Sequence, residues 1–198
     1  MNYLAHLYLS GNEHDVLFGN FIADHLKGPD RQLPFDQLIR QGIALHRHID
    51  RYTDTHNIVA QSKARVRPQF GKYAPVIVDV FYDHFLAIGW SNFHNLPLPE
   101  FSKQVYALLQ ARQNEMPASA QHMLPFMVQH DWLTNYARPL GIRRVMQGMS
   151  RRTRFVSGMD KAPDLLFEEY DAFKAEFEAF FPELEKSCMH FMHNAAAP

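Results

Sequence analysis

The stretch LHRHIDRYTD, residues 45–54, places His46, Asp50 and Asp54 at intervals of four residues. In a helix, side chains four residues apart lie on one face, so an imidazole and a carboxylate from successive turns meet there. Apolar residues before and within this stretch recur at helical spacing. The pattern therefore predicts a long helix after Pro34 that carries a polar constellation.

The run DVFYDHF repeats this arrangement, with Asp79 and Asp83 one helical turn apart and His84 next in the chain. Its neighbours are mostly valine, isoleucine, leucine and phenylalanine. Pro75 suits the first turn of a helix, and the apolar pattern extends that helix to about Trp90. Charged groups in such surroundings are costly to bury unless they are paired or bound to a metal. Two such constellations in apolar helices predict one metal-dependent site.

The rest of the chain is also helical in pattern. No stretch shows sustained alternation bounded by hairpin turns, so a sheet is not expected. A length of 198 residues fits one domain with a sizeable core. We therefore predict an all-α helical bundle forming a single domain over residues 1–198. One further helix is predicted over residues 16–26, with an end near Gly28 and Pro29. Shorter helices are predicted after Pro99, Pro117 and Leu140, and the last helix is predicted to begin near Asp164.

The composition is that of an ordinary soluble protein, with 46% hydrophobic and 21% charged residues. No apolar stretch approaches the roughly 20 residues that cross a bilayer, and the first residues lack the basic flank of a signal peptide. These features predict a cytoplasmic protein without membrane insertion. Cys188 is the only cysteine, which excludes an intrachain disulfide and a metal site built from several thiolates.

Charge is distributed unevenly along the chain, although the net charge is only −1. Residues 132–159 contain six arginines and no acidic residue, whereas residues 164–185 contain eight acidic residues and only Lys174 as a base. A basic block of this kind is either a solvated face or a site for an acidic partner or phosphates. The pattern alone leaves both interpretations open.

A single histidine and aspartate one turn apart is more often structural than catalytic. The second constellation, together with Asp24 inside GNFIADHLKG and His6 in the apolar N-terminal segment, favours a metal site. Carboxylate and imidazole donors suit Mn²⁺, Fe²⁺ or Mg²⁺, with Zn²⁺ less favoured. Helices packed as a bundle can direct such side chains toward one point. We expect that point to be shared by Asp24, His46, Asp83 and His84, with His6, Asp50 and Asp79 around it.

Other catalytic devices are missing from the sequence. The glycines are too far apart for either nucleotide-binding fingerprint, and no serine or cysteine lies in a nucleophile-elbow context. A hydrolase with this sequence would therefore use metal-activated water. The literal His-Asp dipeptides at residues 14–15 and 130–131 have no helix-spaced partner, and we expect both to be structural or on the surface.

Five motifs, in one order, resemble those of the acyl carrier protein phosphodiesterases. They are MNYLAHLYLS, GNFIADHLKG, LHRHIDRYTD, APVIVDVFYDHFLAIGW and GMSRRTR, and they span residues 1 to about 155. The resemblance implies an all-helical fold distantly similar to the HD phosphohydrolases and a divalent metal, with manganese preferred. It also implies hydrolysis of the phosphodiester that joins 4′-phosphopantetheine to a serine of the carrier protein.

Carried over by motif, the resemblance implies the site candidates His6, Asp24, His46, Asp50, Asp79, Asp83 and His84. Among them we expect His6, Asp24, His46, Asp83 and His84 to bind the metal, and Asp50 and Asp79, together with Arg47, to be catalytic. Arg47 and Arg51 flank the metal residues and are candidates for binding the phosphate, although a surface salt bridge explains either one equally well.

Carrier proteins of this kind are small and acidic, so a basic surface should guide their binding. The acid-free block is the candidate docking surface, particularly Arg143, Arg144, Arg151, Arg152 and Arg154. The alternative docking surface lies around Lys63, Arg65 and Arg67.

Two other functions are alternatives for this sequence. One is a metal-dependent phosphohydrolase that uses the same site on a nucleotide or another small phosphodiester. The other is a non-catalytic helical module whose arginine-rich face docks an acidic protein or nucleic acid, with strong salt dependence and no turnover. The carrier-protein interpretation predicts no nucleic-acid partner.

Overall fold

The computed structural model describes residues 1–26 and 34–195, and within these ranges the chain forms helices and connecting turns without a strand. The predicted all-α fold class is therefore confirmed. The helices are α1 (Tyr3–Leu9), α2 (His14–Ile22), α3 (Gln37–Thr55), α4 (Asn57–Phe70), α5 (Ala74–Ile88), α6 (Leu98–Ala111), α7 (Ala118–Gln129), α8 (Trp132–Asn135), α9 (Pro139–Arg152), α10 (Ala162–Glu168) and α11 (Tyr170–Ala195).

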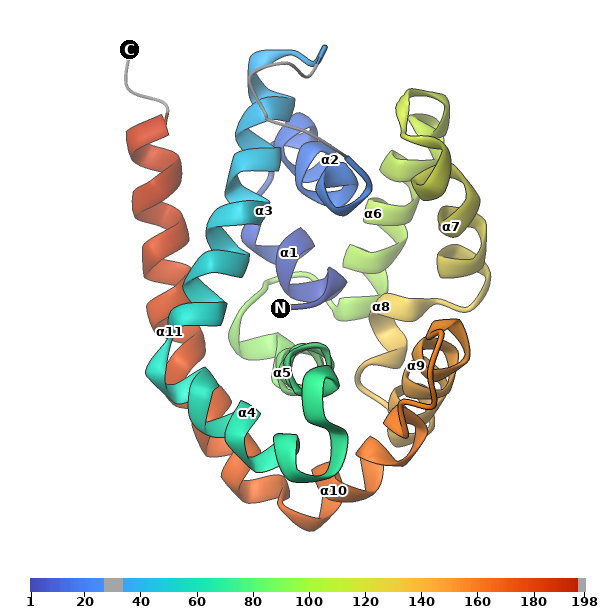
Figure 1. Ribbon diagram of the computed structural model, residues 1–198. Helices are drawn as coiled ribbons and strands as arrows, with labels where there is room; N and C mark the ends of the chain where they lie inside the picture. Colours follow the sequence, from blue (N-terminus) through green and yellow to red (C-terminus); the bar gives the residue numbers. More distant parts are fainter. Residues whose placement is uncertain (27–33, 196–198) are drawn as a thin grey trace.

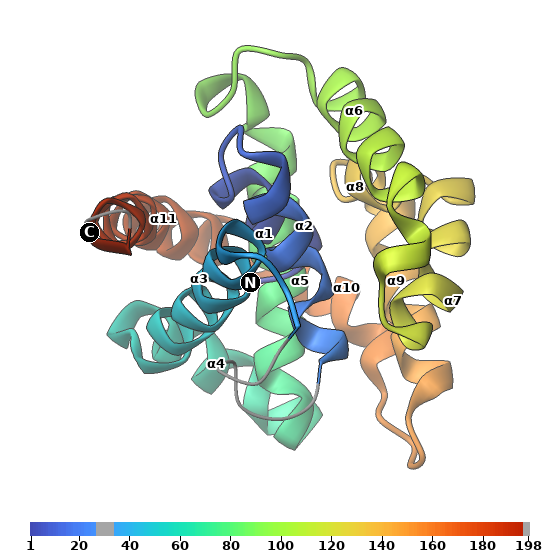
Figure 2. The same ribbon diagram turned by 90° about the horizontal axis from the view of Figure 1, so that it is seen from above.

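Helices α1 and α5 lie at the centre of the molecule (Figure 1). Helices α3, α4 and α11 pack together on one side of them, and α6 to α9 lie on the other side, an arrangement that is also visible from above (Figure 2). Buried apolar side chains from α1 to α11 form one contiguous cluster between these groups. No helix in the described ranges is long and apolar enough to span a membrane.

Helix α5 is central because it is apolar on nearly all of its surface. Its sequence, APVIVDVFYDHFLAI, buries side chains on every face, as expected for a helix that is hydrophobic all round. Pro75 lies in its first turn, as the sequence predicts. The polar side chains of Tyr82, Asp83 and His84 are nevertheless buried with the apolar ones, so each must find a hydrogen-bonding partner in the protein interior.

Two glycines bring α2 and α3 unusually close. A Cβ at Gly19 would lie 2.0 Å from the carbonyl oxygen of Ile39, and a Cβ at Gly42 would lie 2.1 Å from that of Val16. Only residues without a side chain permit this contact between backbones. The close packing places the end of α2 and the following turn, Ala23–His25, beside the middle of α3.

The structure differs from the predicted helices at several points. The predicted helix over residues 16–26 ends earlier, at Ile22, and the expected stop at Gly28 and Pro29 lies outside the described residues. The predicted last helix is divided at Glu169, so that α10 packs against α9 while α11 packs against α3, α4 and α5. The sequence pattern does not predict α1, α4 and α8, because each of these helices is short or has weak apolar periodicity.

Candidate metal centre

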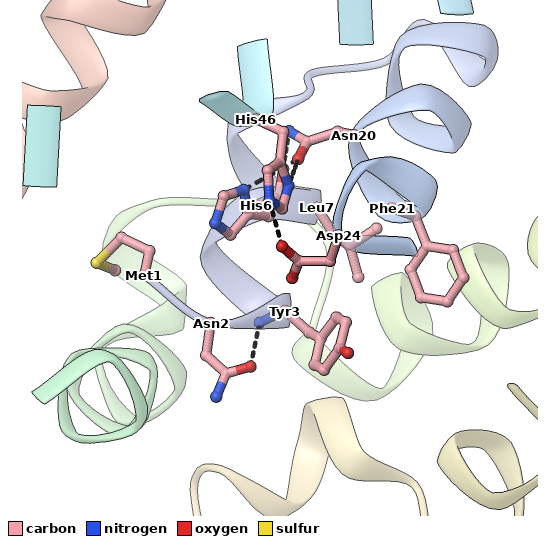
Figure 3. A pocket seen from close by; sticks show the side chains of 9 residues that line it. All are labelled: Met1, Asn2, Tyr3, His6, Leu7, Asn20, Phe21, Asp24 and His46. Carbon is pink, nitrogen blue, oxygen red and sulfur yellow. Dashed lines mark hydrogen bonds and ion pairs between the residues drawn. The ribbon is translucent and has the colours of Figure 1, made fainter. Parts of the chain in front are cut away.

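His6 of α1 and His46 of α3 lie face to face in the protein interior. Their ring centroids are 4.1 Å apart with an interplanar angle of 25°. Only 5% of His6 and 6% of His46 is exposed. Figure 3 shows the two imidazoles stacked beside Asn20, with the Asp24 carboxylate turned toward them. The first constellation of the sequence thus lies where α1, α2 and α3 meet.

Asn20 of α2 fixes the orientation of both rings. Its Oδ1 lies 3.0 Å from Nδ1 of His6 and 3.0 Å from Nδ1 of His46. Its Nδ2 donates to the carbonyl oxygen of His6 and to Oγ of Ser10, both at 2.9 Å, so the amide cannot be turned around without losing these bonds. Because an amide oxygen only accepts, each Nδ1 must carry the hydrogen. In the neutral form of each ring, Nε2 is then left with a free lone pair.

Two carboxylates face these Nε2 atoms. Nε2 of His46 lies 3.0 Å from Oδ1 of Asp24 and 3.2 Å from Oδ2 of Asp50, while Nε2 of His6 lies 3.2 Å from Oδ1 of Asp50. Asp50 therefore contacts both imidazoles, one with each oxygen. The ligand atoms of His6, His46 and Asp50 all lie within 4.8 Å of one another. We refer to His6, Asp24, His46 and Asp50 as the histidine–aspartate cluster.

The cluster is buried on its histidine side and open on its carboxylate side. The Asp50 side chain is 43% exposed and that of Asp24 is 61% exposed. A cavity of about 30 Å³ lies against the cluster, lined by Met1, Asn2, Tyr3, His6, Leu7, Asn20, Phe21, Asp24 and His46 (Figure 3). A cavity of this size has room for a water molecule or a single ion.

The electrostatics of the cluster reflect the contact between buried imidazoles and carboxylates. Burial disfavours a charged His46, but the Asp24 and Asp50 carboxylates outweigh burial and raise the pKa of His46 to about 9. Burial and the nearby charge of His46 lower the pKa of His6. Hydrogen bonds from the imidazoles hold the pKa of Asp24 and of Asp50 below its ordinary value, which for Asp50 means overcoming the opposing effect of burial. In the absence of a cation, a proton on Nε2 of His46 allows this ring to donate to both Asp24 and Asp50.

The second constellation serves a different purpose. Oδ1 of Asp83 accepts from the backbone nitrogen of Asn2 at 3.1 Å, and Oδ2 accepts from that of Leu4 at 2.8 Å. Oδ1 of Asp79 accepts from the ammonium group of Met1 at 3.0 Å. The two carboxylates thus anchor the start of α1, which carries His6. The predicted approach of Asp83 and Asp79 to Asp24 and His46 is not what the structure shows, because both oxygens of Asp83 and Oδ1 of Asp79 accept from N–H groups at the start of α1.

His84 is also engaged elsewhere. Its Nδ1 donates to the carbonyl oxygen of Tyr136 at 2.7 Å, and its Nε2 accepts from the hydroxyl of Tyr170 at 3.0 Å. Burial lowers the pKa of His84, which is consistent with a neutral ring in this setting. Both ring nitrogens are therefore used by partners outside the histidine–aspartate cluster, and the expected convergence of His84 with Asp24 and His46 is not found.

The basic candidates lie on α3, α4 and α9, with Arg154 just beyond α9. Arg47 is partly buried and Arg51 is exposed, each one residue after a member of the cluster on α3. Arg143 pairs with Asp164 at 2.8 Å. In the alternative docking surface, Lys63 pairs with Asp54 at 2.7 Å and Arg65 bridges two glutamates of the C-terminal region, so both of these side chains are already paired.

Three of the remaining candidates, Arg144, Arg151 and Arg152, line a large groove. The groove has a volume of about 640 Å³ and lies between α7, α8 and α9. We call it the arginine-rimmed groove. Its lining residues are Tyr3, Phe126, Gln129, His130, Asp131, Trp132, Asn135, Tyr136, Arg138, Gly141, Arg144, Val145, Gln147, Gly148, Met149, Arg151 and Arg152.

Asn20, which contacts both imidazoles, is not among the site residues predicted from the sequence. Its signal was present, because an amide within the apolar run VLFGNFI must find hydrogen-bonding partners if the helix is buried. The sequence does not show that those partners are two imidazoles from other helices. Tyr3, which lines both the small cavity and the groove, was likewise not singled out.

The sequence of this chain is similar to those of one protein family. The family model described as acyl carrier protein phosphodiesterase matches residues 1–184. Proteins named acyl carrier protein phosphodiesterase from Enterobacter sp. (strain 638) and Photorhabdus laumondii are 34% and 32% identical, covering 93% and 92% of this chain and 95% and 92% of their own. A protein of that name from Yersinia pestis is 29% identical over 96% of this chain and 98% of its own. No solved structure matches.

Proposed function

Since this chain belongs to the acyl carrier protein phosphodiesterase family, we propose that it hydrolyses the phosphodiester of holo acyl carrier protein. In this reaction a bond forms between phosphorus and a water oxygen, and the bond between phosphorus and the serine oxygen breaks. The serine oxygen leaves with a proton, so the products are apo carrier protein and 4′-phosphopantetheine. The observation that carries the proposal is the histidine–aspartate cluster, whose two imidazoles are held in one tautomer by Asn20.

The donor set of the cluster fits a divalent cation. With both Nδ1 atoms donating to Asn20, neutral His46 directs its Nε2 lone pair toward Asp24 and Asp50, and neutral His6 directs its Nε2 lone pair toward Asp50. Ligating histidines in proteins have their other nitrogen fixed in this way by a hydrogen-bonding partner. Mixed nitrogen and carboxylate donors suit Mn²⁺ or Fe²⁺, with Mg²⁺ as a further alternative. We take Mn²⁺ first because the family resemblance implies it. A bound cation would lower the pKa of water and stabilise negative charge on the phosphate.

The chain's own residues supply position and charge around that cation. His6 and His46 form its buried side, and the exposed carboxylates of Asp24 and Asp50 face the solvent from which the phosphodiester arrives. Arg47 and Arg51 follow His46 and Asp50 directly on α3, and we assign them to the negative charge of the phosphate. Asp79 and Asp83 act indirectly, by fixing the helix that carries His6.

Recognition of the carrier protein is assigned to the basic rim of the groove. Arg144, Arg151 and Arg152 are exposed there, and a basic surface attracts and orients an acidic protein. Arg143 is the weakest member of the predicted docking set, because its guanidinium already pairs with Asp164.

Intact mass spectrometry of holo carrier protein tests this function. Wild-type protein with Mn²⁺ is expected to convert holo into apo carrier protein, and His46→Ala and Asp50→Asn are expected to lose that activity. Asp54→Asn is the matched control, because Asp54 lies on the same helix one turn beyond Asp50 and pairs with Lys63 instead. An intact prosthetic group, under conditions in which the protein cleaves a nucleotide phosphodiester, would assign the site to a small-molecule phosphohydrolase instead. Equal activity of Asp50→Asn and Asp54→Asn would remove the cluster from the reaction.

A further inference from the structure

The arginine-rimmed groove has a floor and a rim of different character. Tyr136 on the floor is buried, and Trp132, Val145 and Met149 are partly buried, so the floor is mainly aromatic and aliphatic. The rim carries exposed arginines and the exposed amides of Gln129 and Gln147. Partly buried Asn135 adds a further amide, whose nitrogen donates to the carbonyl oxygens of His130 and Asp131. Its volume of about 640 Å³ lies within the range of small-molecule sites, roughly 300–1,000 Å³.

The groove begins beside the histidine–aspartate cluster. Tyr3 lines both the small cavity at the cluster and the groove. Its ring packs against Phe21 on the cluster side, with ring centroids 6.0 Å apart, and against Trp132 on the groove side, with centroids 6.1 Å apart. Helix α1 lies between α3, which carries the cluster residues His46 and Asp50, and α8, which carries Trp132 (Figure 1). A molecule whose phosphate reached the cluster could therefore extend past Tyr3 into the groove.

We propose that the floor of the arginine-rimmed groove binds the pantetheine arm of the substrate, an assignment that rests on the proposed function. The arm is attached directly to the phosphate, is uncharged, and combines a dimethyl carbon, two amides and a terminal thiol. Aromatic and aliphatic side chains can cover its carbon atoms, and the amide side chains can pair with its amides. The arm needs no positive charge, so the rim arginines remain available to the acidic carrier protein.

An acidic protein segment fits the floor less well than the arm does. Asp131 places a carboxylate among the lining residues, where it would repel an acidic side chain. The guanidinium group of Arg152 lies 5.5 Å from the centre of the Trp132 ring, so even this arginine covers an aromatic surface. The distribution of charge therefore separates a neutral ligand on the floor from an acidic protein at the rim.

Gly148 offers a way to fill the groove without disturbing the fold. It lies in α9 and lines the groove, and a Cβ built on it meets no atom within 4 Å. Every side chain other than proline is more favourable than glycine inside a helix. Gly148→Phe is therefore expected to place a ring in the groove of a folded protein, and Gly148→Ala is the matched control with almost no added volume.

The experiment measures three binding affinities with Mn²⁺-loaded protein: for 4′-phosphopantetheine, for methyl phosphate and for apo carrier protein. Gly148→Phe is expected to weaken 4′-phosphopantetheine binding by about tenfold or more, because the ring occupies the ligand's volume. Binding of methyl phosphate, which has no arm, should be unchanged. Apo carrier protein should lose less affinity than 4′-phosphopantetheine does, although Gly148 shares a helix face with the rim arginines. Gly148→Ala should match wild type for all three ligands. The KM for holo carrier protein should rise in Gly148→Phe alone.

Unchanged 4′-phosphopantetheine binding in Gly148→Phe would overturn the assignment. It would also be overturned if apo carrier protein lost affinity while 4′-phosphopantetheine did not, since the groove would then hold the protein. Failure of the wild type to release the prosthetic group would contradict the proposed function, and this assignment with it. If the wild type is active, and Gly148→Phe is equally active and binds 4′-phosphopantetheine equally well, the groove assignment is rejected and the proposed function stands.

Discussion

Replacing Asn20 with leucine tests whether this amide prepares the two imidazoles for a cation. Leucine has a similar size but accepts no hydrogen bond, so Nδ1 of His6 and Nδ1 of His46 would both lose their partner. Asn20 is fully buried, and water cannot easily replace the amide. A buried polar group without a partner costs about 1–3 kcal/mol, so two of them predict a loss of roughly 2–6 kcal/mol in the free energy of unfolding of the metal-free protein.

The same substitution should weaken metal binding separately from stability. Partners that fix a ligating histidine typically contribute about 10–100-fold to metal affinity or activity, and Asn20→Leu removes that partner from both rings. Calorimetric titration with Mn²⁺ measures the affinity, and urea unfolding of the metal-free protein measures the stability.

Asn20→Asp is the matched control for this experiment. It keeps an acceptor for both Nδ1–H groups but loses the donor to the carbonyl oxygen of His6. It should therefore be less stable than wild type and yet retain Mn²⁺ affinity. Wild-type Mn²⁺ affinity in a folded Asn20→Leu variant would refute this reasoning. An equal loss of affinity in both variants would show that Asn20 acts through packing rather than through the imidazole tautomer.

Three further predictions follow from the same structure. Asp83→Asn should lower the free energy of unfolding by about 1–3 kcal/mol, because one N–H at the start of α1 loses its acceptor. Elemental analysis should find the same metal content as in wild type. A metal content as low as that of His46→Ala would show that Asp83 is a metal ligand. Gly19→Ala should destabilise by about 1–3 kcal/mol or more, because its Cβ would meet the carbonyl of Ile39 at 2.0 Å and force α2 away from α3; a melting temperature equal to that of wild type would contradict the close packing. Charge reversal at Arg151 and Arg152 should raise the KM for holo carrier protein and change how that KM depends on salt, while the rate of hydrolysis of a small phosphodiester stays nearly unchanged. A parallel loss of both activities would show that these arginines act in the active site or in folding.

The all-α fold and the first constellation could be predicted from the sequence because both depend on local geometry. The distance between His46 and Asp50 is set by one turn of a helix, and their contact at 3.2 Å follows from their spacing. The prediction that His6 and Asp24 join them is also consistent with the observed contacts. Here the residue types were informative, since a polar group in an apolar helix must meet another polar group.

The second constellation shows where this reasoning stops. Asp79 and Asp83 have the same spacing as His46 and Asp50, but the sequence does not reveal which groups face them across the helix boundary. The ammonium group of Met1 and the backbone N–H groups of α1 occupy that position, so the same pattern produces an anchor instead of ligands.

The packing of α2 on α3 could not be predicted either. It depends on Gly19 and Gly42 facing backbone atoms of the other helix, which is a property of the assembled fold and not of either helix alone. The position of Asn20 between two imidazoles is a consequence of that packing. The sequence therefore identified half of the cluster by spacing, and the fold supplied the residue that orients it.

In the proposed reaction, a water oxygen attacks the phosphorus of holo carrier protein at the histidine–aspartate cluster. The most direct measurement is mass spectrometry of both products after reaction with Mn²⁺ in water labelled with the heavy oxygen isotope. We predict the label in the phosphate of released 4′-phosphopantetheine, unlabelled apo carrier protein, and no release by His46→Ala. Label in the serine of the carrier protein, or equal release by His46→Ala, would contradict the account.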